Sequence, residues 1–363
     1  MHVHVIDPSA FTPPYDHALC AALARAGADV ELITSRFDYG PRPPVEGFAV
    51  RESFYRRAPG RPGSRVRRAV KVAEHGPDLL RYRSEGRAAD VVHVQWLAVP
   101  PLDAALLPRG RRGLVYTVHN AAREGLGRAE RRLAGRADAV VVHSEAARAR
   151  VEEQRAAPAE RVHLIPHGAF DYLAKLPGER RLPPELAGDS SPGRAVVLCF
   201  GLLRPYKGID VLLEAWRGVD GAELWIVGAP RMDIDPLRAA APPGVRFVTR
   251  FAPDQEVAAC FERAALVVLP HTRVDQSGAA FAALAFGRPL LLTDLGGFPE
   301  LAATGAAALI PPRDPAALHA ELVRLLADPD ALASMAAAAA SAAAGPYSWD
   351  AIGRRTLELY HEL

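Results

Sequence analysis

Short runs of apolar residues alternate with longer stretches of helical periodicity over the first half of the chain. The apolar runs predict buried strands over 3–6, 29–34, 91–94, 114–118, 139–143 and 162–165. The periodic stretches predict helices over 16–26, 122–133 and 144–154. Strands that alternate with helices in this way are typical of βαβ units and predict a parallel sheet.

A second series of the same kind fills the second half. Its predicted strands are 196–200, 223–227, 246–248, 266–269, 290–293 and 307–310, and its predicted helices are 209–216, 255–264, 279–286, 315–326, 331–343 and 349–363. Residues 178–194 are polar and rich in Pro and Gly, which predicts a linker. We therefore expect a first domain over 1–177, a second over 195–345 and a closing helix over 346–363, with a cleft between the domains as the natural place for a site.

The composition supports two globular domains and excludes several other classes. The chain has 363 residues, of which 49% are hydrophobic and 24% charged, and its net charge of +2 gives no field that would attract nucleic acid. Its cysteines are scattered in apolar settings and predict neither disulfides nor a metal set; they are Cys20, Cys199 and Cys260. Met1 leads directly into the first strand, without a signal peptide, and no apolar run is long enough to span a membrane. We therefore expect a cytoplasmic protein.

One segment, Arg56 to Lys71, is strongly basic. Such a segment can contact an anionic lipid surface, which would make the protein peripheral to the inner face of the membrane. An equally good reading is a solvated basic helix with its loop. Nucleic acid is disfavoured because the only neighbouring aromatic residues are Phe54 and Tyr55.

The chemistry is expected at the loop that follows the strand 196–200. Gly201 breaks this strand, and Arg204 and Lys207 lie between it and the next helix. Open α/β sheets bind ligands at the carboxyl ends of their strands, and the start of a helix favours anions. The chain has three lysines, so a lysine in this loop is an unusual choice. The alternative is a solvated loop with two ordinary surface cations.

Three further loops offer polar groups after predicted strands. Ser277 is placed to cap a helix, and with the following glycine it could turn backbone N–H groups towards an anion. The second loop, 294–300, carries paired glycines. His119 ends the strand YTVH, where it could act as an acid, a base or a hydrogen-bond donor, or be purely structural. The sequence has no P-loop, no G-x-G-x-x-G after its first strand and no G-x-S-x-G, and the spacing of six other histidines predicts no metal site: His2, His4, His93, His143, His163 and His167.

In this order, these loops resemble glycosyltransferase family 4, the retaining nucleotide-sugar transferases with the GT-B fold. The resemblance covers nearly the whole chain and is most specific at 137–145, 164–168, 201–216 and 286–301. It implies two Rossmann-like domains that face each other across a cleft, with a closing helix that crosses back to the first domain.

The resemblance also implies roles for individual residues. Lys207 matches the family lysine that holds the donor diphosphate, and Arg204 replaces the family arginine, whose usual position is Leu202 here. Arginine binds phosphate bidentately and lysine adds a point charge, so together they would stabilise the leaving diphosphate without a metal. His119 matches the histidine that faces the donor sugar, and Phe251 lies where the family lines the base pocket.

The chain departs from the family pattern in two loops. The family's two glutamates, eight positions apart, fall on Val274 and Ala282, which suggests that the donor is bound by Ser277 and backbone amides instead. The predicted donor-binding set is Gly201, Phe251, Asp275, Ser277, Gly278, Gly296 and Gly297. The first-strand loop lacks the paired glycines and contains Pro14 and Tyr15, which we expect in a stiffer acceptor-side loop.

The expected function is transfer of a sugar from a nucleoside-diphosphate sugar to an acceptor hydroxyl, with retention and with neither a metal nor a further cofactor. The acceptor could be lipid-linked or a small natural product. The alternative is a non-catalytic or partner-dependent sugar-nucleotide binding protein of the same fold, which the missing glutamates would favour.

Overall fold

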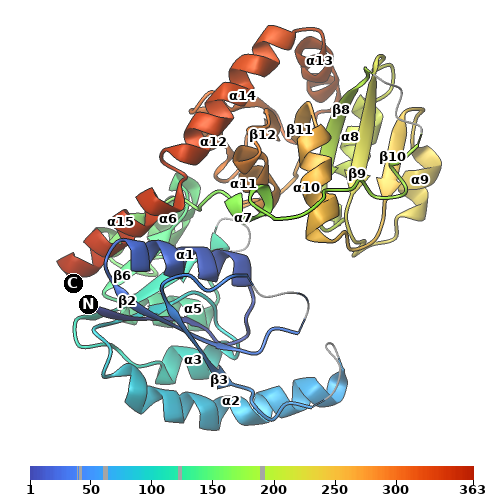
Figure 1. The fold of residues 1–363 in the computed structure, drawn as a ribbon. Coiled ribbons are helices and arrows are strands. Elements are labelled where there is room, and N and C mark those ends of the chain that lie inside the picture. The colour runs from blue at the N-terminus through green and yellow to red at the C-terminus, as the bar shows by residue number, and fades with distance from the viewer. Residues whose placement is uncertain (39, 41–42, 60–63, 122–124, 189–192) are drawn as a thin grey trace. The chain divides into compact units, whose positions relative to one another are not determined.

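The computed structural model describes residues 1–38, 40, 43–59, 64–121, 125–188 and 193–363. The chain forms two compact units, one of Met1–His167 with Trp349–Leu363 and one of Gly168–Ser348. Each unit is a parallel sheet covered by helices, as the alternating pattern predicted (Figure 1).

The first unit contains a seven-stranded sheet in the order β3-β2-β1-β4-β5-β6-β7. Its strands are β1 (His2–Asp7), β2 (Asp29–Ser35), β3 (Ala49–Phe54), β4 (Val91–Val94), β5 (Gly113–Val118), β6 (Ala139–Val142) and β7 (Val162–Leu164). Its described helices are α1 (Pro13–Arg25), α2 (Arg65–Gly86), α3 (Pro100–Leu106), α5 (Arg128–Arg136), α6 (Glu145–Glu153) and α15 (Trp349–Glu362), with a 3₁₀ turn at Ala159–Arg161. The strand order reverses between β1 and β4, the point at which sheets of this kind bind ligands.

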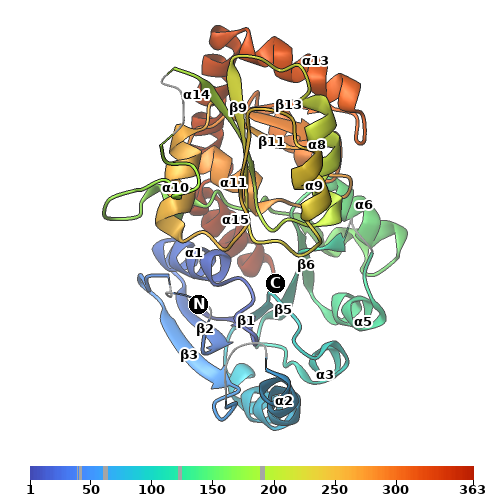
Figure 2. The same ribbon diagram turned by 90° about the vertical axis from the view of Figure 1, so that its right-hand side faces the viewer.

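The second unit repeats this order with six strands, β10-β9-β8-β11-β12-β13. They are β8 (Ala195–Phe200), β9 (Ala222–Val227), β10 (Val245–Val248), β11 (Leu266–Leu269), β12 (Leu290–Thr293) and β13 (Ala307–Ile310). The helices are α7 (Asp171–Ala174), α8 (Ile209–Ala215), α9 (Asp235–Ala240), α10 (Asp254–Arg263), α11 (Gly278–Ala285), α12 (Phe298–Ala302), α13 (Pro315–Leu326) and α14 (Pro329–Ala344) (Figure 2). β8, β9, β11 and β12 are apolar because helices cover both faces of the sheet, and the reversal lies between β8 and β11.

The closing helix α15 packs on α1 of the first unit, as expected. Gly353 of α15 approaches α1 so closely that a side-chain carbon there would lie 2.7 Å from the carbonyl oxygen of Ala22. Arg25 and Asp350 join the two helices by an ion pair of 2.7 Å. The small residue and the ion pair explain why this last stretch belongs to the first unit.

The expected linker differs from the structure in its described part. The division between the units falls at His167, ahead of residue 177, and residues 178–188 belong to the second unit. Leu186 is fully buried in the core of that unit, and Glu185 pairs with Arg250 at 2.8 Å. The described part of this segment therefore packs on the second unit and is not a free linker. Residues 189–192 lie outside the described residues.

One expectation for the first unit is corrected, and a second segment is only partly described. Pro14 and Tyr15 lie in the first turn of α1 and not in a loop, because Pro13 and Pro14 fit the start of a helix, where no backbone N–H is needed. The basic segment from Arg56 is partly the long helix α2, while residues 60–63 of that segment, and residues 122–124 of a predicted helix, lie outside the described residues.

Candidate functional site

The loop after β8 carries Lys207 inward. A 3₁₀ turn of Pro205–Lys207 follows the strand, and Gly208 begins α8 with a φ of +66°. A side-chain carbon on Gly208 would lie 2.0 Å from the carbonyl oxygen of Pro270, so only glycine lets this turn pack against the residues that follow β11. The lysine side chain is 9% exposed as a result.

The partner of Lys207 is His271, which follows β11. The Nζ atom of Lys207 lies 2.8 Å from Nε2 of His271, whose side chain is buried. Burial, and secondarily the charge of Lys207, holds the pKa of His271 well below its ordinary value, so the imidazole is neutral and its Nε2 accepts the hydrogen bond. Burial lowers the pKa of Lys207 to about 8, with Arg204 adding to the effect and Cys199 opposing it, so the ammonium persists at neutral pH.

Lys207 has no carboxylate partner among the described residues. A buried cation without a counter-ion is costly, and a neutral histidine does not balance its charge. Arg204, at the start of the same turn, is half-buried, and its guanidinium makes no hydrogen bond or ion pair with any described residue. Two neighbouring cations that lack anions form a site that an anionic ligand would complete.

The loops after β11 and β12 pack against each other beside this pair. Gly297 donates its backbone N–H to the carbonyl oxygen of Asp275 at 3.0 Å, and Thr293 donates its hydroxyl to the carbonyl oxygen of His271 at 2.9 Å. A side-chain carbon on Gly296, whose φ is +56°, would lie 2.4 Å from the carbonyl oxygen of Val274. The paired glycines therefore serve this close packing, and their role towards a donor stays a prediction.

Ser277 occupies the N-cap position of α11, as predicted, but its side chain makes no capping hydrogen bond. Its Oγ atom is buried and has no partner among the described residues. Gly278 is exposed, and a side-chain carbon on it would lie 2.9 Å from the ring of Phe170, so a packing contact already explains that glycine. The unpaired hydroxyl of Ser277 is the better candidate for a ligand contact.

The remaining donor-side residues are less informative. Gly201 has a φ of +124° and leaves room for Lys207, whose Nζ would lie 3.2 Å from an added side-chain carbon. Asp275 is buried, whereas Phe251 is 71% exposed in the loop after β10. Contact of either with a nucleotide stays a prediction.

His119, in the first unit, follows β5 and lies within a group of aromatic rings. Its ring stacks on Trp96 at 4.4 Å with an angle of 9° between the planes. Its two nitrogens face the side-chain amide of Gln95 at 3.1 Å and Nε2 of His143 at 3.3 Å. Burial, together with the neighbouring His143, His167 and His93, holds the pKa of His119 well below its ordinary value, so the ring is neutral.

A chain of hydrogen bonds fixes the tautomer of His119. The carbonyl oxygen of Ile165 can only accept, so Nδ1 of His143, 2.8 Å away, carries the proton. Burial lowers the pKa of His143 to about 4, so its Nε2 is unprotonated and accepts from Nδ1 of His119. The lone pair of Nε2 of His119 then faces Oε1 of Gln95 at 3.1 Å, and a half-turn of this amide would bring its nitrogen, which has no partner among the described residues, into place as the donor. His119 is thus held as a neutral, oriented ring.

Tyr15 is part of the same group, which explains why it does not serve as a loop residue. Its side chain is buried, and its ring lies 5.1 Å from that of His119, 4.9 Å from that of His167 and 5.2 Å from that of Trp349. The tyrosine therefore joins α1, the ends of the central strands and α15.

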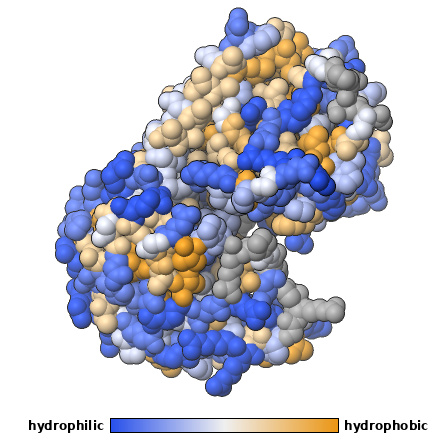
Figure 3. Space-filling model, viewed as in Figure 1, coloured by the Kyte–Doolittle hydropathy of each residue, from blue (hydrophilic) through white to orange (hydrophobic). Residues whose placement is uncertain are grey.

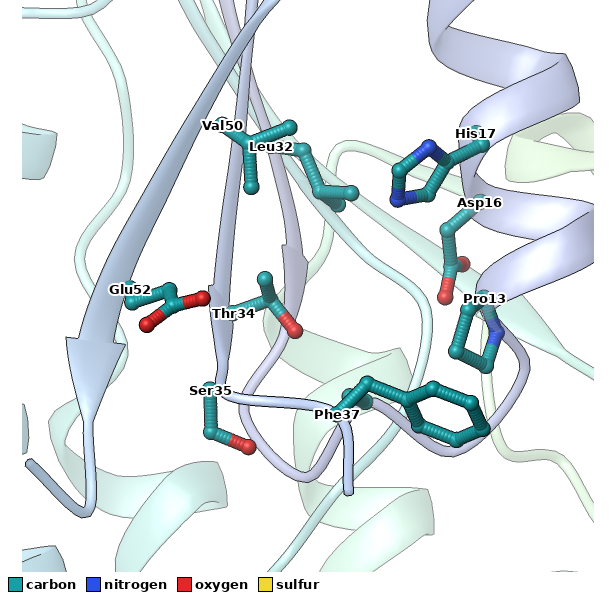
Figure 4. Close-up of a pocket in the computed structure, with 10 residues that line it drawn as sticks. Pro13, Asp16, His17, Leu32, Thr34, Ser35, Phe37, Val50 and Glu52 are labelled. Atoms are coloured by element: carbon teal, nitrogen blue, oxygen red, sulfur yellow. The ribbon is translucent and has the colours of Figure 1, made fainter. Parts of the chain in front are cut away.

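A narrow pocket opens between α1 and the edge of the sheet in the first unit (Figure 4). Asp16, Ser35 and Glu52 contribute polar atoms to it, and its free volume is about 20 Å³. The adjacent carboxyls of Asp16 and Asp7 are both buried, which raises the pKa of each. A cavity of this size accommodates one water-sized group and no sugar.

Sequence reasoning missed His271, although a signal was present. Pro270 and His271 directly follow the apolar run 266–269, as His119 follows its own strand. Every polar residue that follows a strand beside a reversal of strand order is therefore a candidate site residue. Gln95 and Trp96, which follow β4 and contact His119, could have been found in the same way.

Two family models match the chain, one for each unit. Residues 15–169 match "Glycosyltransferase Family 4", and residues 194–328 match "Glycosyl transferases group 1". Among curated proteins, the chain is 28% identical to the alpha-D-kanosaminyltransferase of Streptomyces kanamyceticus, over 65% of this chain and 63% of that protein. It is also 28% identical to a D-inositol 3-phosphate glycosyltransferase of Nocardia farcinica, over 93% of this chain and 81% of that protein. The chain spans from 54% to 63% of the lengths of the first curated relatives that it matches.

Solved structures share the fold at low sequence identity. The sucrose-phosphate synthase of Thermosynechococcus elongatus superposes with a TM-score of 0.72 at 19% identity, over 100% of this chain and 98% of that one. The HepE protein of Anabaena in complex with UDP-glucose superposes with a TM-score of 0.71 at 17% identity, over 100% of both chains. In the described part of the chain, no helix combines the length and apolar character needed to cross a membrane. Two Rossmann-like units, a helix α15 that returns to the first unit, and the two family models in this order together show that the chain belongs to glycosyltransferase family 4, with the GT-B fold.

Proposed function

We propose that this protein transfers a sugar from a nucleoside-diphosphate sugar to an acceptor hydroxyl, with retention of configuration and without a metal ion. The proposal rests on Lys207, whose buried ammonium donates a hydrogen bond to a neutral histidine. No carboxylate among the described residues balances its charge. A diphosphate supplies the missing negative charge. The structural relative HepE was crystallised with UDP-glucose, which supports this class of donor.

The proposed chemistry assigns distinct work to the two cations. When the bond between the anomeric carbon and the diphosphate oxygen breaks, negative charge develops on the leaving group. Lys207 would lower the energy of that charge in a site shielded from water, where an electrostatic contact is strongest. Arg204 would bind two phosphate oxygens at once and fix their orientation. Two fixed cations can replace the divalent ion that often neutralises a leaving diphosphate.

The donor would be oriented without the family's two carboxylates. Val274 and Ala282 occupy those positions and are buried. Their apolar side chains cannot accept hydrogen bonds from a sugar or a ribose. The free hydroxyl of Ser277 and the backbone groups of the surrounding loops are the proposed replacements.

Calorimetric titration with UDP, GDP, ADP and dTDP tests the site directly. We expect one nucleotide to bind wild-type protein and to lose nearly all affinity for Lys207→Ala. Lys175→Ala is the matched control, because Lys175 is an exposed lysine of the same unit that pairs with Asp171 at 2.6 Å. Equal binding to wild type and Lys207→Ala would refute the site, and binding of none of the four would favour the non-catalytic alternative.

Turnover separates an enzyme from a sugar-nucleotide binding protein. Wild-type protein given the matching donor without acceptor is expected to release free nucleoside diphosphate slowly, and Lys207→Ala is not. Release should persist in EDTA if no metal is needed. The anomeric configuration of a product, read by NMR, then tests retention, and an inverted product would refute it.

A membrane surface is the second part of the proposal. Arg65 and Arg68 are exposed on α2 beside the exposed apolar residues Val66 and Val72, and the visible face of this helix is largely hydrophilic (Figure 3). Exposed arginines beside apolar side chains suit an anionic bilayer, where a lipid-linked acceptor would reside. Sedimentation with anionic vesicles at low and moderate salt tests this. Binding that weakens with salt would support it, and no binding at low salt would favour a small dissolved acceptor.

A further inference from the structure

A second cluster of polar side chains lies at the amino ends of strands in the first sheet, away from the carboxyl ends where His119 lies. The proposed sugar transfer does not use it. His2 and His4 begin β1, where their spacing of two residues places both on one face of the sheet. Glu31 of the adjacent strand β2 is the register partner of His4. His119, by contrast, follows the carboxyl end of β5. The two sites are therefore at different ends of a parallel sheet.

The three side chains turn their ligand atoms towards one another. Nε2 of His2 lies 3.0 Å from Nε2 of His4, and this nitrogen lies 3.4 Å from Oε2 of Glu31. One ligand atom from each residue falls within 4.8 Å of the other two. Two ligands bound to one tetrahedral zinc ion are about 3.3–3.6 Å apart, given bonds of about 2.0–2.2 Å. Two of the three separations are thus already near those of a metal site.

Each of the three side chains also makes a hydrogen bond through its other polar atom. Nδ1 of His2 lies 2.9 Å from the carboxylate of Asp29, and Nδ1 of His4 lies 3.1 Å from the hydroxyl of Tyr82. Oε1 of Glu31 accepts a hydrogen bond of 2.7 Å from Arg51. Metal-binding histidines usually carry such a carboxylate or hydroxyl on the second ring nitrogen, where it fixes the ring and its tautomer.

The protonation states suit a cation. Burial, and secondarily His2, lowers the pKa of His4 to about 4, so this ring is neutral at pH 7 and needs to lose no proton on binding. The carboxylate of Asp29 can only accept, so in the neutral ring of His2 the proton lies on Nδ1 and Nε2 can accept. Nε2 of His4 then holds the proton between the two rings, and metal binding would shift that proton to Nδ1, where the oxygen of Tyr82 accepts it.

The surrounding charge favours a positive ion in spite of one nearby guanidinium. Arg51 contacts Glu31 and also pairs with Glu85 at 2.5 Å. The charges around the cluster are therefore three carboxylates, those of Asp29, Glu31 and Glu85, and one arginine. Arg51 donates to both oxygens of Glu31, but each carboxylate oxygen has two lone pairs, so Oε2 can accept from Arg51 with one and bind a metal with the other.

We propose that His2, His4 and Glu31 bind one divalent ion of the zinc class, with water in the remaining position. Two imidazoles and a carboxylate suit Zn²⁺ better than Mg²⁺ or Ca²⁺, which prefer oxygen ligands alone. The ion would tie the amino ends of β1 and β2 together and stabilise the first unit. It would take no part in sugar transfer, and it is independent of the proposed function.

Zinc titration of the full chain, freed of affinity tags and stripped with EDTA, tests the proposal. Calorimetry should show one equivalent of Zn²⁺ bound to wild-type protein and to His361→Ala, which removes an exposed histidine outside the cluster. His2→Ala and Glu31→Gln should lose this binding. Asp29→Asn should weaken it by about 10–100-fold, because it removes only the partner of His2.

Two further measurements guard against variants that fail to fold and against binding elsewhere. His2 is partly exposed, so His2→Ala should keep the wild-type circular dichroism spectrum while losing the rise in Tm that Zn²⁺ gives the wild type. Co²⁺ in place of Zn²⁺ should give the visible absorption of a tetrahedral ion in wild type only. The proposal is wrong if wild-type protein binds no stoichiometric Zn²⁺, or if His2→Ala binds it equally well.

Discussion

Each sheet is followed, at the carboxyl end of one strand, by a histidine with a different set of partners: His119 after β5 and the buried His271 after β11. In the first unit, His119 is stacked on Trp96 and hydrogen-bonded through both ring nitrogens. In the second unit, His271 faces a buried ammonium whose charge no described carboxylate balances. Both ring nitrogens of His119 thus face groups of the protein itself, whereas the ammonium beside His271 needs an anion.

This difference separates residues that position a site from residues that bind a ligand. A polar group whose partners all come from the protein gains orientation and stability. A buried polar group without them costs stability, and such a cost is typical of functional sites. The comparison therefore predicts that the strongest effects on nucleotide binding lie in the second unit, and that changes in the first unit act on turnover or stability.

Lys207→Ala should have the largest effect. Removal of the buried ammonium deletes the main charge that we propose faces the leaving diphosphate, and turnover should fall by about 10²–10³-fold, as for loss of one preorganised group in a transition state. The free energy of unfolding should not fall, because the ammonium is uncompensated in the free protein. Steady-state turnover and chemical unfolding measure the two quantities. A variant that loses activity and stability together would mean that Lys207 is a structural residue.

His119→Ala should have an intermediate effect of another kind. The change removes a ring from the stack with Trp96 and leaves Nε2 of His143 without the donor that now faces it, so turnover should fall while nucleotide affinity stays within about twofold. Calorimetry with the preferred nucleotide, beside steady-state kinetics, separates the two. His163→Ala provides a control, since His163 is half-buried and lies on β7, which is separated from β5 by β6. A large loss of nucleotide affinity in His119→Ala would overturn the contrast between the two units.

A change of pH should alter nucleotide affinity less than these substitutions alter turnover. The pH dependence should report the protonation of Lys207. Burial lowers the pKa of Lys207 to about 8, and the charged form binds the anion. Affinity should therefore be full below pH 8 and fall as the pH rises above it, by at most about tenfold per pH unit. A bound diphosphate opposes the effect of burial and moves the midpoint of this fall upward. Calorimetry from pH 6.5 to 9.5 measures it, and Lys207→Arg, which stays charged, should remove the dependence.

The sequence predicted the fold because the patterns that determine it are local. Apolar runs and helical periods identified most strands of both sheets, and the glycines and cations of the loops marked the edge where a site would lie. Pro14 and Tyr15 were misplaced because proline is common both in loops and at the first turn of a helix. Residues 178–188 have the composition of a linker, and composition does not reveal that Leu186 is buried in the second unit.

The parts of the site that sequence reasoning missed depend on contacts between distant segments. His271 becomes significant only when Lys207, 64 residues earlier, reaches its ring. Similarly, His2 and His4 show no metal-ligand spacing by themselves, because the third ligand atom comes from the next strand. Motif spacing records neighbours along one element, whereas strand register and loop packing create these sites.

Ser277→Ala should have the smallest effect and gives the finest test of the comparison. The Oγ atom of Ser277 is buried without a partner among the described residues, so its removal should leave stability unchanged or raise it slightly. If the hydroxyl contacts the donor, the same variant should lose about tenfold or less in affinity for the nucleotide sugar. Thermal unfolding and calorimetry with the donor measure the two effects. Gly278→Ala is the matched control at the next residue, and it should lower stability because its new side-chain carbon would lie 2.9 Å from the ring of Phe170. Lower stability with unchanged donor affinity in Ser277→Ala would mean that this hydroxyl serves the fold, and that an unpaired buried group does not by itself identify a ligand contact here.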